Sequence, residues 1–394
     1  MAERDLDSEL DRAWAGWLTA LTDAGRLVSD GTLLPDAGPA ELAESYLHIA
    51  EQSVLWLTWH LGHGDPTQPR FIRQNDFFTQ WGGPNADNIY RHARIDPAGR
   101  YRIRGRMHSC QEWLLAVRVG NMHEEQRGTL AEISASELGV ASGGEFELLL
   151  GGPPQRRGWL PIPEGARMIA VREYYYDWRP EEPATFTIER LDAPPGPPPR
   201  PTPDQVAAAL TDATVQYSRA PHFWSRYLED RRSEAPINEF IAPRREARGL
   251  AALQYAFCFF DLAPDEALLV EVDVPDARYW SFQLYALGTY HALDLGRVTS
   301  LNHSQLAQGP TGRVVAVVAH DDPGVANWLD TEGRRTAQLT FRCGWGEPTA
   351  PTARVVRVAD LESELPPETP RVTAQQRMDQ LAGRAEHLRW RWRT

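Results

Sequence analysis

A cluster of polar side chains follows a run of apolar, β-forming residues at 313–318. The cluster comprises His320, Asp322, Asn327, Trp328 and Asp330. A Pro-Gly turn explains the acidic residues, but it needs no histidine, asparagine or tryptophan beside it. A histidine next to carboxylates can transfer protons near neutral pH. We therefore expect His320 to be a catalytic proton shuttle with Asp322 or Asp330 as its partner. A purely structural turn is the alternative.

A second polar cluster surrounds a Trp-Gly-Gly-Pro bend at 81–84. Its side chains are Asp76, Trp81, Asn85, Asp87 and Tyr90. The glycines allow the backbone to approach another group closely. The amides and carboxylates could hydrogen-bond a polar ligand, or they could satisfy the backbone of their own loop. If the two clusters face each other, the acidic and amide groups of this bend would complete one site.

Residues 278–283 alternate along a predicted strand. One face takes Tyr279, Ser281 and Gln283, and the other takes Arg278, Trp280 and Phe282. If the Gln283 face is buried, its amide needs a partner, which could be a ligand or His320. The substrate-binding side chains expected around this strand are Tyr279, Trp280, Gln283, Asn302, Asn327 and Trp328.

Several of these motifs resemble the DUF1214 family. They are His-x-Asp-Pro-Gly-x-x-Asn-Trp-Leu-Asp-Thr at 320–331, the stretches 277–285 and 300–302, and Pro-Thr-Ala-Arg-Val-Val at 351–356. The resemblance spans about residues 250–360. Residues 80–90 are similar to the DUF1254 region that often precedes it. The resemblance implies a β-sandwich architecture and leaves the activity undefined.

Composition narrows the classes of function. The 394 residues suffice for two domains, and 42% hydrophobic with 24% charged residues are typical of a soluble globular protein. A net charge of −13 argues against nucleic-acid binding. The first residues are charged and no apolar run could span a bilayer, so we expect a cytoplasmic protein without a membrane partner.

Several catalytic chemistries lack their residues. All 41 basic residues are arginine, which excludes Schiff-base chemistry and a Walker-type phosphate loop. Neither a G-x-S-x-G nor a G-x-G-x-x-G motif is present. The cysteines lie far apart, at Cys110, Cys258 and Cys343, and the pair His60 and His63 sits at a glycine-rich helix end. We expect neither a metal nor a cofactor.

The chain is expected to be mainly β with helices: two antiparallel, jelly-roll-like β-sandwich domains plus flanking helices. The predicted regions are N-terminal helices at 1–65, a first sandwich at 66–192, a Pro-rich linker at 193–203, a connecting helix at 204–235, a second sandwich at 236–362 and a C-terminal helix at 363–394. The amphipathic helices, at 7–28 and 39–62, are expected to bury their apolar faces.

The sequence favours a metal-independent enzyme. It would act by acid–base chemistry on a small, largely apolar or terpenoid-like molecule in an aromatic-lined pocket. The 14 Trp, 12 Tyr and 12 Phe could line that pocket, although most aromatic residues pack cores. The alternative is a carbohydrate-binding or carbohydrate-processing β-sandwich module without a cofactor. A small-molecule partner is expected, and a homo-oligomeric state is compatible with the sequence.

Overall fold

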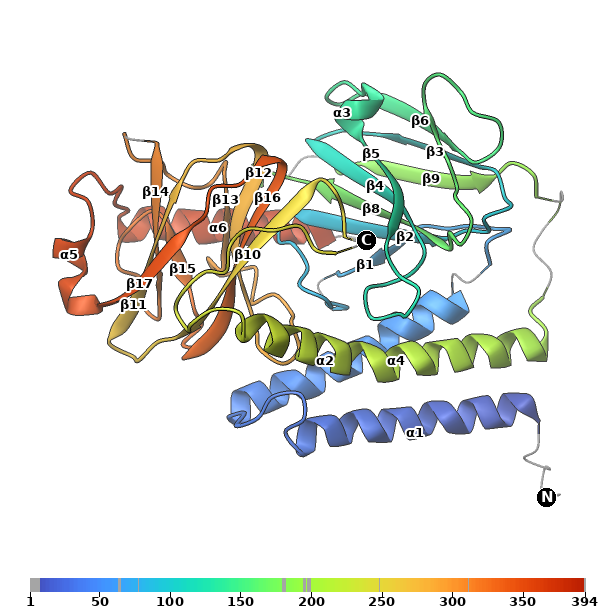
Figure 1. Cartoon of the computed structure of the whole chain (residues 1–394), viewed down its shortest axis with the longest axis horizontal. Helices are drawn as coiled ribbons and strands as arrows, with labels where there is room; N and C mark the ends of the chain where they lie inside the picture. Colours follow the sequence, from blue (N-terminus) through green and yellow to red (C-terminus); the bar gives the residue numbers. More distant parts are fainter. Residues whose placement is uncertain are drawn as a thin grey trace. The chain divides into compact units, whose positions relative to one another are not determined.

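The computed structural model divides into two compact units (Figure 1). It describes residues 8–62, 65–76, 78–178, 182–193, 196, 200–247, 249–310 and 312–392. Unit 1 comprises Met1–Gly82, Ile89–Tyr174 and Glu182–Ser225, and unit 2 comprises Gly83–Asn88, Tyr175–Glu181 and Arg226–Thr394. Part of the predicted linker at 193–203 lies outside the described residues. His63 of the candidate metal pair also lies outside them.

Unit 1 contains a sandwich of two sheets. The first sheet has the order β1 (Ile72–Gln74), β2 (Asn88–Arg94), β8 (Met168–Tyr174), β4 (Glu112–Arg118) and β5 (Thr129–Ser134). The second has the order β7 (Trp159–Leu160), β6 (Glu145–Leu150), β3 (Tyr101–Arg106) and β9 (Thr185–Arg190). The ring of Trp113 from the first sheet lies 5.0 Å from that of Phe146 and 6.1 Å from that of Phe186 in the second. These rings fill the core between the two layers.

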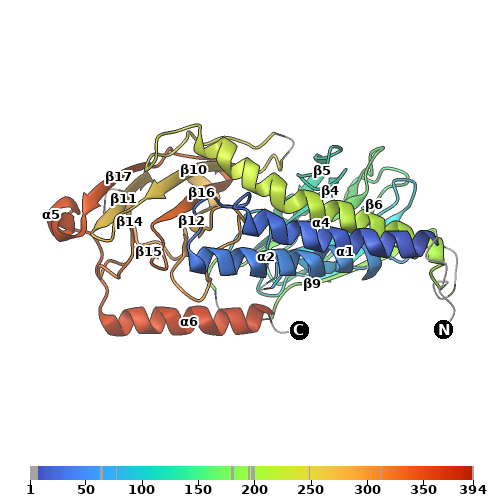
Figure 2. The same cartoon turned by 90° about the horizontal axis from the view of Figure 1, so that it is seen from below.

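Three long helices accompany this sandwich in the described residues: α1 (Glu9–Ser29), α2 (Pro39–Leu57) and α4 (Pro203–Arg232). A short helix, α3 (Ala135–Leu138), follows β5. In both views α1 and α2 lie side by side (Figure 2). Trp17 of α1 packs on Tyr217 of α4 with ring centroids 5.1 Å apart. The expectation that both apolar helix faces are buried is only partly met, because Trp14 and Leu18 of α1 are about half exposed. A helix face this wide is not covered completely by two neighbouring helices.

Unit 2 is a second two-sheet sandwich. One sheet has the order β10 (Leu253–Asp261), β16 (Thr336–Glu347), β12 (Asp276–Tyr285) and β13 (Ser300–Asn302). The other has the order β15 (Trp328–Asp330), β14 (Arg313–Ala319), β11 (Glu266–Asp273) and β17 (Thr352–Arg357). Their facing sides form one continuous apolar core. The short helix α5 (Leu361–Glu364) and the long helix α6 (Ala374–Trp392) end the unit.

The predicted fold class is confirmed, since each unit contains a largely antiparallel β-sandwich accompanied by helices. In unit 2 successive strands pass repeatedly from one sheet to the other, as the jelly-roll expectation requires. Among the helices that the structure describes, none combines the length and the apolar composition needed to cross a membrane.

Candidate functional site

One face of the sheet β10-β16-β12-β13 is both buried and polar. Along β12, alternate residues Trp280 and Phe282 belong to the apolar core, whereas Tyr279, Ser281 and Gln283 point to the opposite side and are at most 1% exposed. We call this opposite side the polar face. It consists of Tyr279, Ser281, Gln283, Tyr285, Ser300, Asn302, Gln338, Thr340 and Arg342. A buried sheet face normally carries apolar side chains, because each buried polar group needs a hydrogen-bonding partner.

The strand register brings these side chains together in rows. Ser281 lies opposite Asn302 of β13 on one side and opposite Arg342 of β16 on the other. Gln283 lies opposite Thr340. Directly opposed residues in an antiparallel pair place their side chains on the same side of the sheet. Residues that are distant in the sequence therefore form one continuous polar surface.

Residues 83–88 run across the polar face. The Gln283 amide accepts a hydrogen bond from the Ala86 backbone nitrogen at 2.9 Å and donates one to the Pro84 carbonyl at 3.1 Å. The Tyr285 hydroxyl donates to the same carbonyl at 2.8 Å. The expectation that Gln283 is buried and needs a partner is thus met, but the partner is backbone and neither a ligand nor His320. The backbone of residues 84–86 therefore satisfies both the oxygen and the nitrogen of the Gln283 side chain.

Gly83 allows this segment to lie so close to the sheet. Its φ is +63°, and a Cβ at this position would lie 2.4 Å from the Tyr290 ring. Its nitrogen donates to the Tyr290 carbonyl at 2.9 Å. Both the backbone conformation and the available space therefore exclude a side chain here.

Asp87 is the centre of the hydrogen bonds on this face. Its carboxylate accepts from the Tyr279 hydroxyl at 2.6 Å, the Trp178 indole at 2.6 Å and the Asn302 amide at 2.7 Å. Asn85 completes the group, because its amide donates to the Tyr279 oxygen at 2.8 Å and accepts from the Asp87 nitrogen at 3.1 Å. Three converging donors suit an ionised carboxylate, which can only accept. We call Asn85, Asp87, Trp178, Tyr279 and Asn302 the Asp87 centre.

The phenol proton stays on Tyr279. Burial, followed by the nearby charge of Asp87, raises the pKa of Tyr279 well above its ordinary value of 10. The hydroxyl therefore donates its single proton to Asp87. Since Ser281 also lies 2.9 Å from this oxygen, the phenol is fully hydrogen-bonded within the protein.

Helix α6 supplies the positive charges for this buried carboxylate. The Arg384 guanidinium lies 4.2 Å from the centre of the Trp178 ring, and that of Arg391 lies 5.0 Å from it. Arg384 is further held by the Ser300 carbonyl and hydroxyl, each at 3.0 Å. Burial lowers the pKa of Arg384 to about 9, and the charge of Asp87 opposes that shift. The carboxylate and the guanidinium thus stabilise each other's buried charge.

His303 is the titratable ring next to the Asp87 centre. Its ring centroid lies 5.8 Å from that of Tyr279 and 4.9 Å from that of Tyr176, edge-on in both cases. Burial lowers the pKa of His303 below 6.5, while the charge of Asp87 acts in the opposite direction. Its Nδ1 has no hydrogen-bond partner among the residues that the structure describes. The imidazole is therefore neutral at pH 7. A hydrogen bond to the Trp280 backbone raises its pKa in the same sense as Asp87, and its Nε2 lies 3.5 Å from the Ser304 hydroxyl.

The side chains of the His320 cluster bond their own turns and neighbouring segments of unit 2. His320 pairs through Nδ1 with the Thr331 hydroxyl at 2.8 Å. Asp322 caps the turn at the Gly324 nitrogen at 2.9 Å and pairs with Arg377 at 2.9 Å. Asp330 accepts from the Glu332 backbone nitrogen and from Arg297, each at 2.8 Å. Asn327 bonds the backbone of Ala307 and Val315. The Trp328 indole donates to the Ala319 carbonyl. A catalytic role of His320 stays a prediction. Its Nδ1 is bonded within the loop, whereas its Nε2 is buried without a hydrogen-bond partner among the described residues.

The remaining predicted site residues lie in the sandwich core or in unit 1. Trp280 packs on Phe341 in the core of unit 2. In unit 1, Asp76 pairs with Arg73 at 3.0 Å, Tyr90 stacks under Arg172, and Trp81 packs on Trp56. Five predicted residues therefore meet on the polar face: Asn85, Asp87, Tyr279, Gln283 and Asn302. His303 was not predicted, although it directly follows the motif at 300–302, and Ser281 was placed on the correct strand face but not among the site residues.

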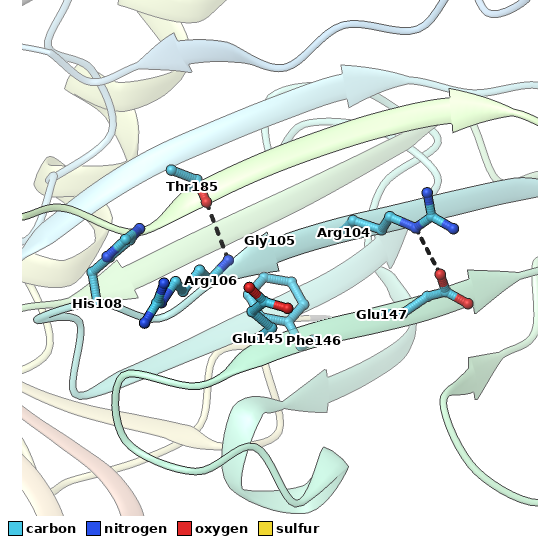
Figure 3. A pocket seen from close by; sticks show the side chains of 8 residues that line it. All are labelled: Arg104, Gly105, Arg106, His108, Glu145, Phe146, Glu147 and Thr185. Carbon is cyan, nitrogen blue, oxygen red and sulfur yellow. Dashed lines mark hydrogen bonds and ion pairs between the residues drawn. The ribbon is translucent and has the colours of Figure 1, made fainter.

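A surface groove of about 610 Å³ lies on the second sheet of unit 1 (Figure 3). One pair of its charged side chains is bonded, since Arg104 binds Glu147 at 2.7 Å. The backbone nitrogen of Arg106 donates to the Thr185 hydroxyl at 3.1 Å. None of the predicted site residues lines it. Within the described ranges, no three His, Cys, Asp or Glu side chains group as metal ligands.

Residues 262–347 match the model of a family described as "Protein of unknown function (DUF1214)". The match bears out the C-terminal resemblance and includes most of the polar face. The chain is similar in structure to an uncharacterized protein from Burkholderia cenocepacia, with 28% identity, coverage of 89% of this chain and 98% of that one, and a TM-score of 0.82. It also matches the VPA0106 protein from Vibrio parahaemolyticus, with 12% identity, coverage of 89% and 100%, and a TM-score of 0.47. No curated protein matches the sequence.

Proposed function

We propose that the chain is an enzyme that acts by acid–base chemistry on a small, largely apolar molecule at the Asp87 centre. The observation that carries this proposal is the ionised Asp87 carboxylate, buried beside a neutral histidine whose Nδ1 has no partner in the described part of the chain. In this proposal His303 is the group that exchanges a proton with the substrate. Asp87 is a positioning residue that stabilises the imidazolium formed by that exchange.

The neighbouring groups support these roles. Tyr279 and Asn302 hold the Asp87 carboxylate by hydrogen bonds of 2.6 and 2.7 Å, which fixes its charge close to His303. The Tyr176 and Tyr279 rings stack on each other and both meet the imidazole edge-on, which places aromatic surface beside His303. Because the pKa of His303 lies below 6.5, the neutral, proton-accepting form predominates at pH 7.

The proposal includes three further points. Residues 80–90, which include Asn85 and Asp87, would belong to a DUF1254-like region that precedes the C-terminal match. The substrate would be terpenoid-like or of similar apolar character, in keeping with the aromatic side chains around His303. The reaction would need no cofactor and would take place in the cytoplasm.

A turnover screen tests the enzyme proposal. The protein is incubated with a panel of terpenoid, steroid and saccharide compounds, and products are detected by mass spectrometry. We expect His303→Gln to abolish turnover and His320→Gln, the matched control, to preserve it. The rate should rise with pH until His303 is deprotonated and then remain level. Loss of turnover in His320→Gln alone would contradict the assignment of the proton shuttle to His303.

A neutral-ligand binding module is the second candidate. Gln338 and Thr340 are fully buried on the polar face, and neither side chain has a hydrogen-bond partner among the described residues. They lie opposite Phe259 and Phe257 of β10. Hydrogen-bonding groups beside aromatic rings are suited to sugars or other polyols. Saccharide binding that is lost in Gln338→Met and occurs without turnover would favour this function over catalysis.

A further inference from the structure

Three aromatic rings of unit 1 form a closed triangle. They belong to Trp56 of α2, to Trp81 and to His123. Their ring centroids lie 5.4 Å apart for Trp56 and Trp81, 5.1 Å for Trp56 and His123, and 5.6 Å for Trp81 and His123, and every contact is edge-on. All three side chains are buried, with at most 7% exposure.

Each ring carries a buried nitrogen with unused hydrogen-bonding capacity. Trp56 Nε1, Trp81 Nε1 and His123 Nδ1 have no hydrogen-bond partner in the described residues. A buried polar atom of this kind is uncommon in a folded protein, and three within one ring cluster call for a common explanation.

The histidine nitrogen is an acceptor. His123 Nε2 is paired with the Gln216 side-chain oxygen, so that Nε2 carries the proton. Burial lowers the pKa of His123 to about 4, and the ring is therefore neutral at pH 7. Nδ1 is then unprotonated. The triangle thus presents two indole N–H donors and one imidazole acceptor.

This set is the complement of a hydroxyl group, which accepts two hydrogen bonds and donates one. We propose that Trp56, Trp81 and His123 form a binding site for the hydroxyl group of a small neutral ligand, an alcohol or a phenol. An ammonium group cannot accept from the indoles, and a carboxylate has no proton for the imidazole. The aromatic ring surfaces suit an apolar ligand body. This site lies in unit 1 and does not depend on the function proposed for the polar face of unit 2.

The position of Trp81 is fixed by its neighbours. The backbone nitrogen of Trp81 donates to the Asn75 side-chain oxygen at 2.6 Å. The preceding residue, Gln80, is tied to α2, because its carbonyl accepts from the Gln52 amide at 2.8 Å and its backbone hydrogen-bonds Glu51. These bonds fix the backbone at Trp81, and the contacts with Trp56 and His123 hold its ring, which reduces the entropy lost on binding.

Calorimetric titration of the full chain with phenol tests the site, and toluene is the matched probe without a hydroxyl group. We expect phenol to bind at least about tenfold more tightly than toluene, as the loss of a hydrogen bond of ordinary strength implies. Trp81→Phe and Trp56→Phe each remove one N–H and keep an aromatic ring. Each should reduce the preference for phenol by about tenfold.

Trp113→Phe is the control. Trp113 is also fully buried and its indole nitrogen has no partner among the described residues, but its ring packs in the sandwich core. It should leave the preference for phenol intact. Equal binding of phenol and toluene, an equal loss in Trp113→Phe, or no saturable phenol binding would overturn the proposal. In the last case the triangle holds at most a water molecule. Thermal melting of each variant confirms that it is folded before titration.

Discussion

Replacing Glu51 with glutamine should change how stability depends on pH. Glu51 is 8% exposed, and burial raises the pKa of its carboxyl group from 4.5 to about 7. Between these two values the folded protein binds a proton that the unfolded chain has released. Stability therefore falls as pH rises through this window. Because one pKa unit corresponds to ~1.4 kcal/mol, the complete loss by pH 8 is at most about 3 kcal/mol.

Urea unfolding at pH 5 and at pH 8 measures this effect. Glutamine keeps an acceptor for the Gln80 backbone but cannot ionise. On going from pH 5 to pH 8, the wild-type protein should lose up to about 3 kcal/mol relative to Glu51→Gln. Glu164→Gln, at an exposed position of unit 1, is the matched control and should show no such difference. If the free-energy difference between wild type and Glu51→Gln is the same at both pH values, the reasoning is refuted.

Three further substitutions have distinct expected outcomes. Gly83→Ala should lower the free energy of unfolding by about 1–3 kcal/mol in chemical denaturation, because its φ is positive and a Cβ would clash with Tyr290. Gly16→Ala in α1 is the control: its Cβ would meet no neighbour, so the change should be neutral or slightly stabilising. Thr340→Val should raise the melting temperature, because it removes a buried hydroxyl that has no partner among the described residues. A lower melting temperature would show that this hydroxyl is hydrogen-bonded in solution. His320→Ala should lower the free energy of unfolding by about 1 kcal/mol, because one hydrogen bond is lost, and should leave turnover intact. Abolished turnover would instead identify His320 as the proton shuttle.

The regular elements of the fold could be predicted from the sequence. The helix expected at 7–28 is observed as Glu9–Ser29, because its apolar spacing is helical. Strands β13 (Ser300–Asn302) and β15 (Trp328–Asp330) were not predicted. Three residues are too few to show a periodicity, and such strands exist only because a neighbouring strand provides their hydrogen bonds.

The candidate site could be predicted in its parts but not in its assembly. The alternation around Tyr279 and Gln283 correctly predicted a shared face, and the bend at 81–84 drew attention to Asp87. The bond between Asp87 and Tyr279 joins residues 192 positions apart, which no local pattern encodes. Glu51 gave no signal, because a glutamate in an amphipathic helix is normally solvated, and its raised pKa depends on burial in the folded unit.

Residues 83–88 belong to unit 2, although the residues before and after them belong to unit 1. Hydrogen bonds with the polar face account for this assignment. Residues 83–88 satisfy the amide of Gln283 and bring the Asp87 carboxylate to three donors. Without this segment, the polar side chains of β12 would be left without partners, at a cost of about 1–3 kcal/mol for each buried group. Fold and site are therefore stabilised by the same hydrogen bonds.

The most direct test of the proposed function is the titration of His303 by nuclear magnetic resonance in wild type and in Asp87→Asn. The imidazole signal is assigned by its absence in His303→Gln. We predict a pKa below 6.5 in the wild-type protein and a still lower pKa in Asp87→Asn, because removal of the carboxylate charge disfavours the imidazolium. A pKa that is unchanged by Asp87→Asn would contradict the claim that Asp87 stabilises the protonated form of His303.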